Sequence, residues 1–200
     1  MSDEKLLIFV KAPRLGQVKS RLAKDIGEIA ALHAYRTLSL EVVNSLQSLK
    51  SVDICFTPPD AQEELEHFIK VSGWGFIPQT DGDLGDRLSA AFRSAFAEGF
   101  SRVVIIGSDC PYVLPSDITE AFDNLKAFPL VLGPASDGGY WLIGLNTMAE
   151  GLFQSMPWST DQLLQHTLKA ASNLNLPFQQ LRELSDIDTL SDWREFSART

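Results

Sequence analysis

A carboxylate at the end of an apolar strand is the first feature of this sequence that could do chemistry. Asp109 follows the run "RVVIIGS" directly, and Cys110 and Pro111 then break the apolar pattern. A hard cation such as Mg²⁺ is bound by one or two carboxylates together with substrate phosphates and water, so Asp109 is a candidate metal ligand. The alternative is that Asp109 only caps a turn, a role that Asp often takes in such positions. Cys110 is a weakly supported nucleophile, because no histidine accompanies it in the pattern.

Three further aspartates could complete a site around Asp109. Asp186 and Asp188 alternate in "SDIDT", so in an extended chain both side chains point the same way. We favour Asp188 as the second metal ligand, with Asp186 as its rival, although Asp188 could instead cap the last helix. Asp137, in "PASDGGYW", is the first candidate for a catalytic general base. The two glycines after it, Gly138 and Gly139, would form a tight hairpin turn, approach the donor sugar or acceptor, or do both.

Basic residues gather in the loop after the first apolar run, although the chain as a whole is acidic. The segment "KAPRLGQVKSRL" contains Lys11, Lys19 and Arg21, which we predict to bind phosphates, and Gly16 is a further candidate contact. Lys offers a point charge and Arg a planar fork, and both are standard phosphate ligands. The spacing matches neither G-x-x-x-x-G-K-[ST] nor G-x-G-x-x-G. By pattern alone, a solvated basic loop is therefore an equal alternative.

Two other loops carry candidates for nucleotide or substrate contact. In "QTDGDLGDRL", we predict that Gly82, Asp83, Gly85 and Arg87 line a nucleotide pocket. The acidic residues of that loop could instead only interact with the dipole of the following helix. In "PWST", Trp158 could form an aromatic wall for a substrate, although packing in the core is the commoner role of such a side chain.

The apolar pattern predicts strands that alternate with helices. We expect strands within 6–10, 51–57, 74–79, 102–109, 128–136, 139–145 and 178–184, and helices within 18–48, 60–73, 83–100, 114–125, 159–175 and 189–198. The expected helix caps are Asp60 for the second helix, Ser116 or Asp117 for the fourth, and Thr189 or a neighbouring residue for the last. Strands that alternate with helices imply a three-layer α/β/α sandwich with a mostly parallel mixed sheet. Ligands of such sheets bind beyond the carboxyl ends of the strands, where these loops lie.

Composition narrows the classes of partner and the cellular setting. The chain has 200 residues, of which 44% are hydrophobic, and a net charge of −9. We expect one domain over 1–200, because neither an internal repeat nor a linker is visible. The negative charge argues against nucleic acid or an anionic membrane as main partner. No apolar run approaches the roughly 20 residues of a membrane span, and the N-terminus does not read as a signal peptide. Two isolated cysteines fit a cytoplasmic protein.

The loops taken together resemble a bacterial family, the radical-SAM/selenodomain-associated transferase 1 family, which is glycosyltransferase-like. The matching stretches span nearly the whole chain in the family's order: "LLIFVKAPRLGQVKSRLAKDIG", "QTDGDLGDRLSAAF", "VVIIGSDCPYVLPSDITEAF", "LVLGPASDGGYWLIGL", "FQSMPWST" and "LSDIDTLSDW". The chain is also distantly similar to phospholactate guanylyltransferases, which share the element seen here as "KSRL". The chain departs from two wider patterns. Ser108-Asp109-Cys110 stands where GT-A glycosyltransferases usually have D-x-D, and the first loop lacks the G-G-rich sequence of the superfamily's nucleotidyltransferases.

The resemblance implies a GT-A-like fold of the nucleotide-diphospho-sugar transferase superfamily. It implies that Asp109, at the end of a central strand, holds Mg²⁺ or Mn²⁺ on a nucleotide diphosphate, with the second ligand left open among Asp137, Asp186 and Asp188. We therefore expect a metal-dependent glycosyltransferase-like enzyme that uses a nucleotide sugar and a small acceptor. The alternatives are nucleotidyl transfer from a nucleoside triphosphate, and a nucleotide-binding module without turnover.

Overall fold

A twisted seven-stranded sheet forms the centre of the computed structural model, which describes residues 3–199. In chain order its strands are β1 (Glu4–Lys11), β2 (Val52–Thr57), β3 (Gly75–Pro78), β4 (Arg102–Gly107), β5 (Leu130–Pro134), β6 (Tyr140–Leu145) and β7 (Phe178–Gln180). The strands lie side by side in the order β3-β2-β1-β4-β6-β5-β7. β6 is antiparallel to β4 and β5, and the remaining pairs are parallel. The predicted mostly parallel mixed sheet is confirmed.

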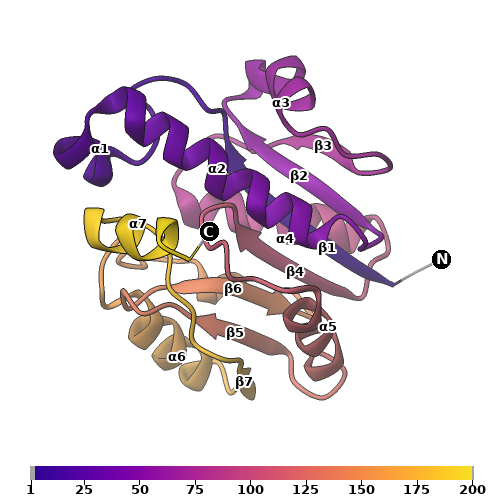
Figure 1. Cartoon of the computed structure of the whole chain (residues 1–200). Coiled ribbons are helices and arrows are strands. Elements are labelled where there is room, and N and C mark those ends of the chain that lie inside the picture. The colour runs from indigo at the N-terminus through magenta and orange to yellow at the C-terminus, as the bar shows by residue number, and fades with distance from the viewer. Residues whose placement is uncertain (1–2, 200) are drawn as a thin grey trace.

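Helices cover both faces of the sheet, so the predicted three-layer arrangement is also confirmed (Figure 1). The helices are α1 (Ser20–Ile26), α2 (Glu28–Leu46), α3 (Gln62–Phe68), α4 (Leu84–Ala97), α5 (Pro115–Asn124), α6 (Leu163–Asn173) and α7 (Leu190–Ser197). One face packs against α2, α3 and α5, and the opposite face against α4 and α6. The short helices α1 and α7 pack together beyond the sheet, through Leu22 and Trp193 among others. Both lie beside the loops that the sequence marks as functional.

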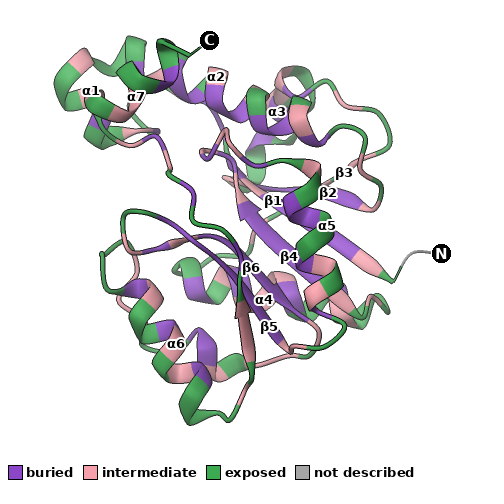
Figure 2. Ribbon diagram, turned by 60° about the horizontal axis from the view of Figure 1, so that its bottom comes forward, coloured by how far each residue is buried: buried purple, intermediate pink, exposed green. Residues whose placement is uncertain are grey.

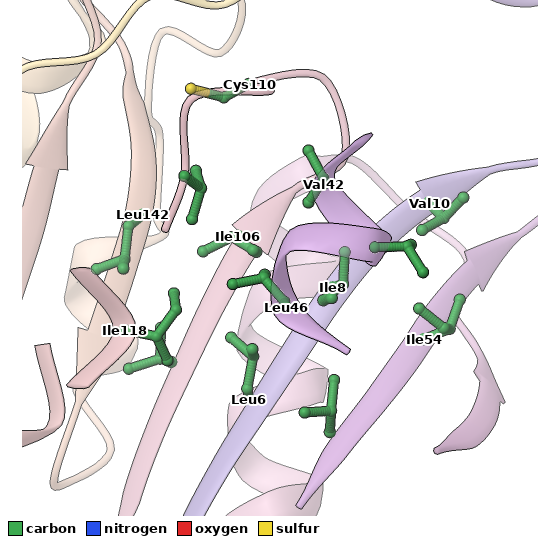
Figure 3. Packing of buried hydrophobic residues seen from close by; sticks show 14 of the residues in the cluster. Leu6, Ile8, Val10, Val42, Leu46, Ile54, Ile106, Cys110, Ile118 and Leu142 are labelled. Carbon is green, nitrogen blue, oxygen red and sulfur yellow. The ribbon is translucent and has the colours of Figure 1, made fainter. Parts of the chain in front are cut away.

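Alternation along β1 explains why the strands are buried on two sides. Leu6, Ile8 and Val10 point into the cluster shared with α2 and α5 (Figure 3), while Leu7 points into the cluster shared with α4. Each such side chain, fully removed from water, stabilises the fold by roughly 1.5–3 kcal/mol. The central strands are buried along most of their length, and the outer faces of the helices are exposed (Figure 2). Strands with apolar residues on both faces form sheets that are covered on both sides, because only then are both faces removed from water.

The region predicted as one helix over 18–48 is two helices, which is a correction. Gly27 separates α1 from α2 with φ 83° and ψ 158°, a conformation that side chains other than glycine rarely adopt. The apolar period continues through the break, which is why the sequence pattern did not reveal it. The late strand is also shorter than predicted, since β7 ends at Gln180 and only an isolated bridge between Ala135 and Leu184 follows.

Two predicted helix caps are wrong, and a third is right. Asp117 is the third residue of α5 rather than its cap: its carboxylate accepts a hydrogen bond from the N–H of Leu114 at 2.8 Å. Asp60 lies in a 3-10 turn, Pro59–Ala61, ahead of α3, and pairs with Arg14 at 3.3 Å. Thr189 caps α7 as expected, because its hydroxyl accepts from the N–H of Asp192.

Candidate functional site

The loops at the carboxyl edge of the sheet line a cavity with a volume of about 640 Å³. The strand register explains this convergence, because Phe9 pairs with Gly107 and Lys11 with Thr57, so β1, β2 and β4 end at one edge. The polar and charged side chains of the lining are those of Lys11, Gln17, Lys19, Ser20, Arg21, Tyr35, Ser108, Asp109, Asp137, Tyr140, Ser159, Thr160, Asp186 and Asp188. Candidate residues from four separate loops therefore share one space.

Lys19 lies between the two carboxylates that the sequence proposes as metal ligands. Its Nζ is 3.0 Å from Oδ2 of Asp109 and 2.8 Å from Oδ1 of Asp188. The Lys19 side chain is only 3% exposed, whereas those of Asp109 and Asp188 are 37% and 35% exposed. Arg21 approaches the other oxygen of Asp188 at 3.6 Å. Cations and acids thus meet in one cluster, in which the two carboxylates are more exposed than the ammonium between them.

Local backbone geometry aims Lys19 at this position. Lys19 precedes α1 and has φ 47° and ψ 47°, a left-handed conformation that is uncommon for a residue with a side chain. Such conformations persist where the surroundings determine them, and they are found preferentially at functional sites. Here the ion pairs with Asp109 and Asp188 hold the side chain of Lys19 in place and so favour this backbone conformation. They also offset the cost of burying the charge of the ammonium.

The electrostatics separate Asp186 from its neighbours. Burial lowers the pKa of Lys19, but the charges of Asp109 and Asp188 outweigh it, so the net shift is upward and the ammonium stays charged. For Asp186, burial together with the charge of Asp109 raises the pKa to about 8, against the opposing charge of Lys19. Asp188, rather than Asp186, is the carboxylate that contacts Lys19 together with Asp109, so Asp188 stays our candidate for the second metal ligand.

Tyr35, on α2, ties the ends of β1 and β4 together, and sequence reasoning missed it. Its hydroxyl donates to the carbonyl oxygen of Lys11 at 2.8 Å, accepts from the N–H of Lys11 at 2.9 Å, and lies 3.2 Å from Oγ of Ser108. Burial raises the pKa of this phenol, so it keeps the proton that it donates. The signal was a tyrosine at a helical position between apolar residues, beside Ala34 and Leu38 on the buried face of α2.

The turn between β5 and β6 confirms the hairpin interpretation of "SDGG" and also faces the cavity. Oδ1 of Asp137 accepts from the N–H of Gly139 at 2.9 Å, and both residues line the cavity. Gly138 has φ +87°, and a Cβ there would lie 2.1 Å from the carbonyl oxygen of Asp161. Its own carbonyl oxygen accepts from the N–H of Leu164 near the start of α6. Gly138 therefore fixes the turn against the chain before α6 and is not among the residues that line the cavity.

The loop before α4 does not bring its predicted residues into this cavity. Asp83 caps α4 in a reciprocal pair with Asp86, at 3.0 and 3.1 Å, and the carbonyl oxygen of Gly82 accepts from Nε of Arg87. Arg87 lines a separate cavity of about 110 Å³ between α4 and the strands β1–β3. Leu84, which we did not single out as a site residue, is the residue of α4 that reaches the main cavity.

Trp158 and Gly85 are partners in packing, a correction to the expectation that both line the pocket. A Cβ on Gly85 would lie 2.7 Å from Cζ2 of Trp158 and 2.6 Å from the carbonyl oxygen of Phe153. Trp158 packs against the apolar cluster beneath α4, and neither residue lines the cavity. Gly16 also lies outside the lining; its φ of +73° serves a turn beside Glu28. Cys110 is 2% exposed and burial raises its pKa, which argues against a nucleophile there.

Asp109 and Asp188 suit a hard cation. Their oxygens already converge on one positive charge, and both remain accessible from the cavity. No cluster of three or more His, Cys, Asp or Glu side chains able to hold a metal occurs within residues 3–199. Two carboxylates with the remaining positions filled by phosphate and water is the arrangement that Mg²⁺ prefers at nucleotide sites.

The fold is that of nucleotide-utilising transferases, to which solved structures are similar. A candidate nucleotide-diphospho-sugar transferase from Desulfovibrio desulfuricans G20 is 32% identical, with a TM-score of 0.91 over 98% of this chain and 87% of that one. A cytidylyltransferase from Leptospira borgpetersenii is 13% identical, with a TM-score of 0.59 over 99% and 86%. Rv0371c from Mycobacterium tuberculosis H37Rv, solved in complex with manganese, is 14% identical, with a TM-score of 0.57 over 98% and 99%. The first two of these structures agree with the predicted class of enzyme, a transferase.

The chain belongs to the family described as "Uncharacterized protein conserved in bacteria (DUF2064)", whose model matches residues 42–160. The search of curated proteins finds no match. Among the described residues, no helix has both the length and the apolar character that crossing a membrane would require.

Proposed function

We propose that this protein is a metal-dependent, glycosyltransferase-like enzyme that acts on a nucleotide-activated sugar. The observation that carries the proposal is the convergence of Asp109 and Asp188 on one cation at the edge of a 640 Å³ cavity. The likeness to the candidate nucleotide-diphospho-sugar transferase supports it. So does the manganese complex of the more distant relative, which shares the fold.

The roles that we propose follow the positions of the side chains. Asp109 and Asp188 would hold Mg²⁺ or Mn²⁺, which would neutralise the diphosphate and the charge that develops on the leaving group. Lys11, Lys19 and Arg21 line the same cavity and would bind the phosphates. Asp137 and Gly139 line this cavity as well, and Asp137 is the general base to test first.

The remaining candidates would act indirectly. Gly82, Asp83 and Arg87 would set the start of α4, and Gly85 with Trp158 would hold α4 against the core, so that Leu84 faces the nucleotide. We further propose that the chain works as one domain over 1–200, of which residues 1, 2 and 200 lie outside the described part. Two buried free thiols support a cytoplasmic location, and the family resemblance drawn from the sequence supports a place among the radical-SAM/selenodomain-associated transferases.

The second candidate is nucleotidyl transfer, in which a phosphate acceptor attacks the α-phosphate of a nucleoside triphosphate. One observation favours it: Lys19, Ser20 and Arg21, the first three residues of the "KSRL" element shared with phospholactate guanylyltransferases, all line the cavity. This candidate uses the same metal and phosphate ligands, but it predicts pyrophosphate as a product.

A donor screen separates the candidates. Purified protein is incubated with nucleotide sugars or nucleoside triphosphates, each with Mg²⁺ or Mn²⁺ and a panel of small hydroxylated and phosphorylated acceptors, and thermal shifts and released products are measured. Release of nucleoside diphosphate from a nucleotide sugar supports glycosyl transfer, and pyrophosphate from a triphosphate supports the rival. Stabilisation by nucleotide and metal with no turnover of any donor would contradict both and leave a binding module. Asp109→Asn serves as the negative control for turnover.

A further inference from the structure

Lys19 occupies the place that the proposed metal would take. The distances from its Nζ to Asp109 and Asp188, 3.0 and 2.8 Å, are those of an ammonium held by two carboxylates. A divalent ion bound by the same two oxygens would lie about 2.0–2.6 Å from each. The two cations would then be almost superimposed, and repulsion between like charges in a partly buried site forbids this. The ammonium and the metal ion therefore compete for one position.

We propose that Lys19 is an exchangeable occupant of the metal site, which leaves the two carboxylates when a metal ion enters together with a diphosphate. This inference rests on the proposed function. Lys19 is fixed at its backbone before α1, but its side chain has four rotatable bonds and lies beside Arg21 in the cavity lining. A metal-bound diphosphate would offer the displaced ammonium a new anionic partner within that cavity.

The exchange defines which ligand the site selects. A free metal ion must displace the ammonium and leave it buried without a partner, which costs free energy. A metal–diphosphate complex supplies both the ion that displaces Lys19 and the anion that receives it. The site therefore binds the complex of a divalent metal with a nucleoside diphosphate moiety in preference to the free ion. Metal and nucleotide are thus coupled through one side chain, and such coupling is reciprocal.

The first test is the affinity for Mn²⁺ without nucleotide, measured by electron paramagnetic resonance for the wild type and for Lys19→Gln. We expect Lys19→Gln to bind Mn²⁺ about tenfold more tightly, because the two carboxylates lose their competing cation. Lys24→Gln, an exposed lysine of α1, removes the same charge and serves as the matched control with unchanged affinity. Circular dichroism verifies that both variants fold. Unchanged or weaker Mn²⁺ binding by Lys19→Gln overturns the exchange.

The second test uses the wild-type protein and does not depend on a variant. Acylation of lysines by an N-hydroxysuccinimide ester is followed by mass spectrometry. Lys19, with its side chain 3% exposed, should react slowly in the metal-free protein, and several-fold faster when Mn²⁺ saturates the site. Adding a nucleoside diphosphate should slow its acylation again. A Lys19 that stays equally protected under saturating Mn²⁺ contradicts the proposal.

The proposed transferase activity and the exchange of Lys19 can be tested independently. Turnover of a nucleotide sugar by the wild type tests the proposed function, and it needs no knowledge of Lys19. If donors are turned over while Lys19→Gln leaves Mn²⁺ affinity unchanged, the exchange is wrong and the function stands. If Lys19→Gln tightens Mn²⁺ binding but no donor is turned over, the exchange stands and the transferase assignment is wrong.

Discussion

Lys19 and Asp188 are 169 positions apart in the sequence, and their charged groups lie 2.8 Å apart. The contact joins the loop after β1 to the segment before α7 across the carboxyl edge of the sheet. Asp109 of β4's following loop completes the cluster from the middle of the chain. Three distant segments are thus held by one buried ammonium, and substitutions in this cluster should change ligand binding and local stability together.

Asp109→Asn should abolish metal-dependent nucleotide binding while the fold is retained. The amide keeps the shape of the side chain but removes the charge that a hard cation requires. The loss should be at least tenfold in the affinity for nucleotide in Mn²⁺, measured by isothermal titration calorimetry. Asp123→Asn, at an exposed position of α5, is the matched control and should bind as the wild type does. Metal-dependent binding by Asp109→Asn that equals the wild type would refute the metal assignment.

Tyr35→Phe should destabilise the protein by about 1–3 kcal/mol, because it leaves buried polar groups of Lys11 and Ser108 without their partner. The same change should weaken nucleotide affinity, since those residues border the cavity. Chemical denaturation gives the free energy of unfolding, and calorimetry gives the affinity. Tyr112→Phe removes a phenol oxygen from a half-buried ring that does not line the cavity, and should leave both unchanged. A neutral Tyr35→Phe would show that the hydroxyl does not position these loops.

Gly85→Ala should lower stability through packing rather than through lost nucleotide contact. The new methyl would lie 2.6 Å from the carbonyl oxygen of Phe153 and 2.7 Å from the ring of Trp158, so backbone or ring must shift. Overpacking of this kind costs roughly 1–3 kcal/mol. Differential scanning calorimetry should show a lower Tm, whereas Ser94→Ala, exposed on the same helix, should not. A normal Tm with a selective loss of nucleotide affinity would return Gly85 to the nucleotide pocket.

Cys55 should resist alkylation in the folded protein at pH 8. Burial raises the pKa of its thiol to about 12, so only about one molecule in ten thousand carries the reactive thiolate at that pH. Its labelling rate by iodoacetamide should rise about tenfold per pH unit while the fold persists. An engineered Ser172→Cys, at an exposed position of α6, should react at once. Equally fast labelling of Cys55 would mean that β2 opens readily.

The raised pKa of Cys55 also predicts how the stability of the protein changes with pH. Because the pKa of Cys55 is higher in the folded protein than in the unfolded chain, its contribution is complete below about pH 8.5 and is lost as the pH rises toward 12. The wild type should therefore lose stability above pH 9 more steeply than Cys55→Ala, when the free energies of unfolding are compared between pH 7 and pH 10. If the free energy of unfolding falls equally with pH in both proteins, ionisation of Cys55 does not cause the loss of stability at alkaline pH.

Much of the fold could be predicted from local patterns because those patterns reflect local physics. Apolar residues on both faces of "LLIFV" and "RVVII" predict strands buried between helices, and the structure has β1 and β4 at the centre of the sheet. The turn at "SDGG" follows from the conformations that glycine allows. The break at Gly27 between α1 and α2 was not predicted, because the apolar period of the sequence continues through it.

The sequence by itself determined which loops gather at one place, since Lys11, Lys19, Arg21, Asp109, Asp137 and Asp188 all line one cavity. Only the tertiary structure decided how these side chains pair. It places Lys19 between Asp109 and Asp188, the two candidate metal ligands, and it packs Gly85 against Trp158. The physical reason is that residue type and spacing report local preference, whereas burial and charge pairing depend on contacts between segments that only the folded chain brings together.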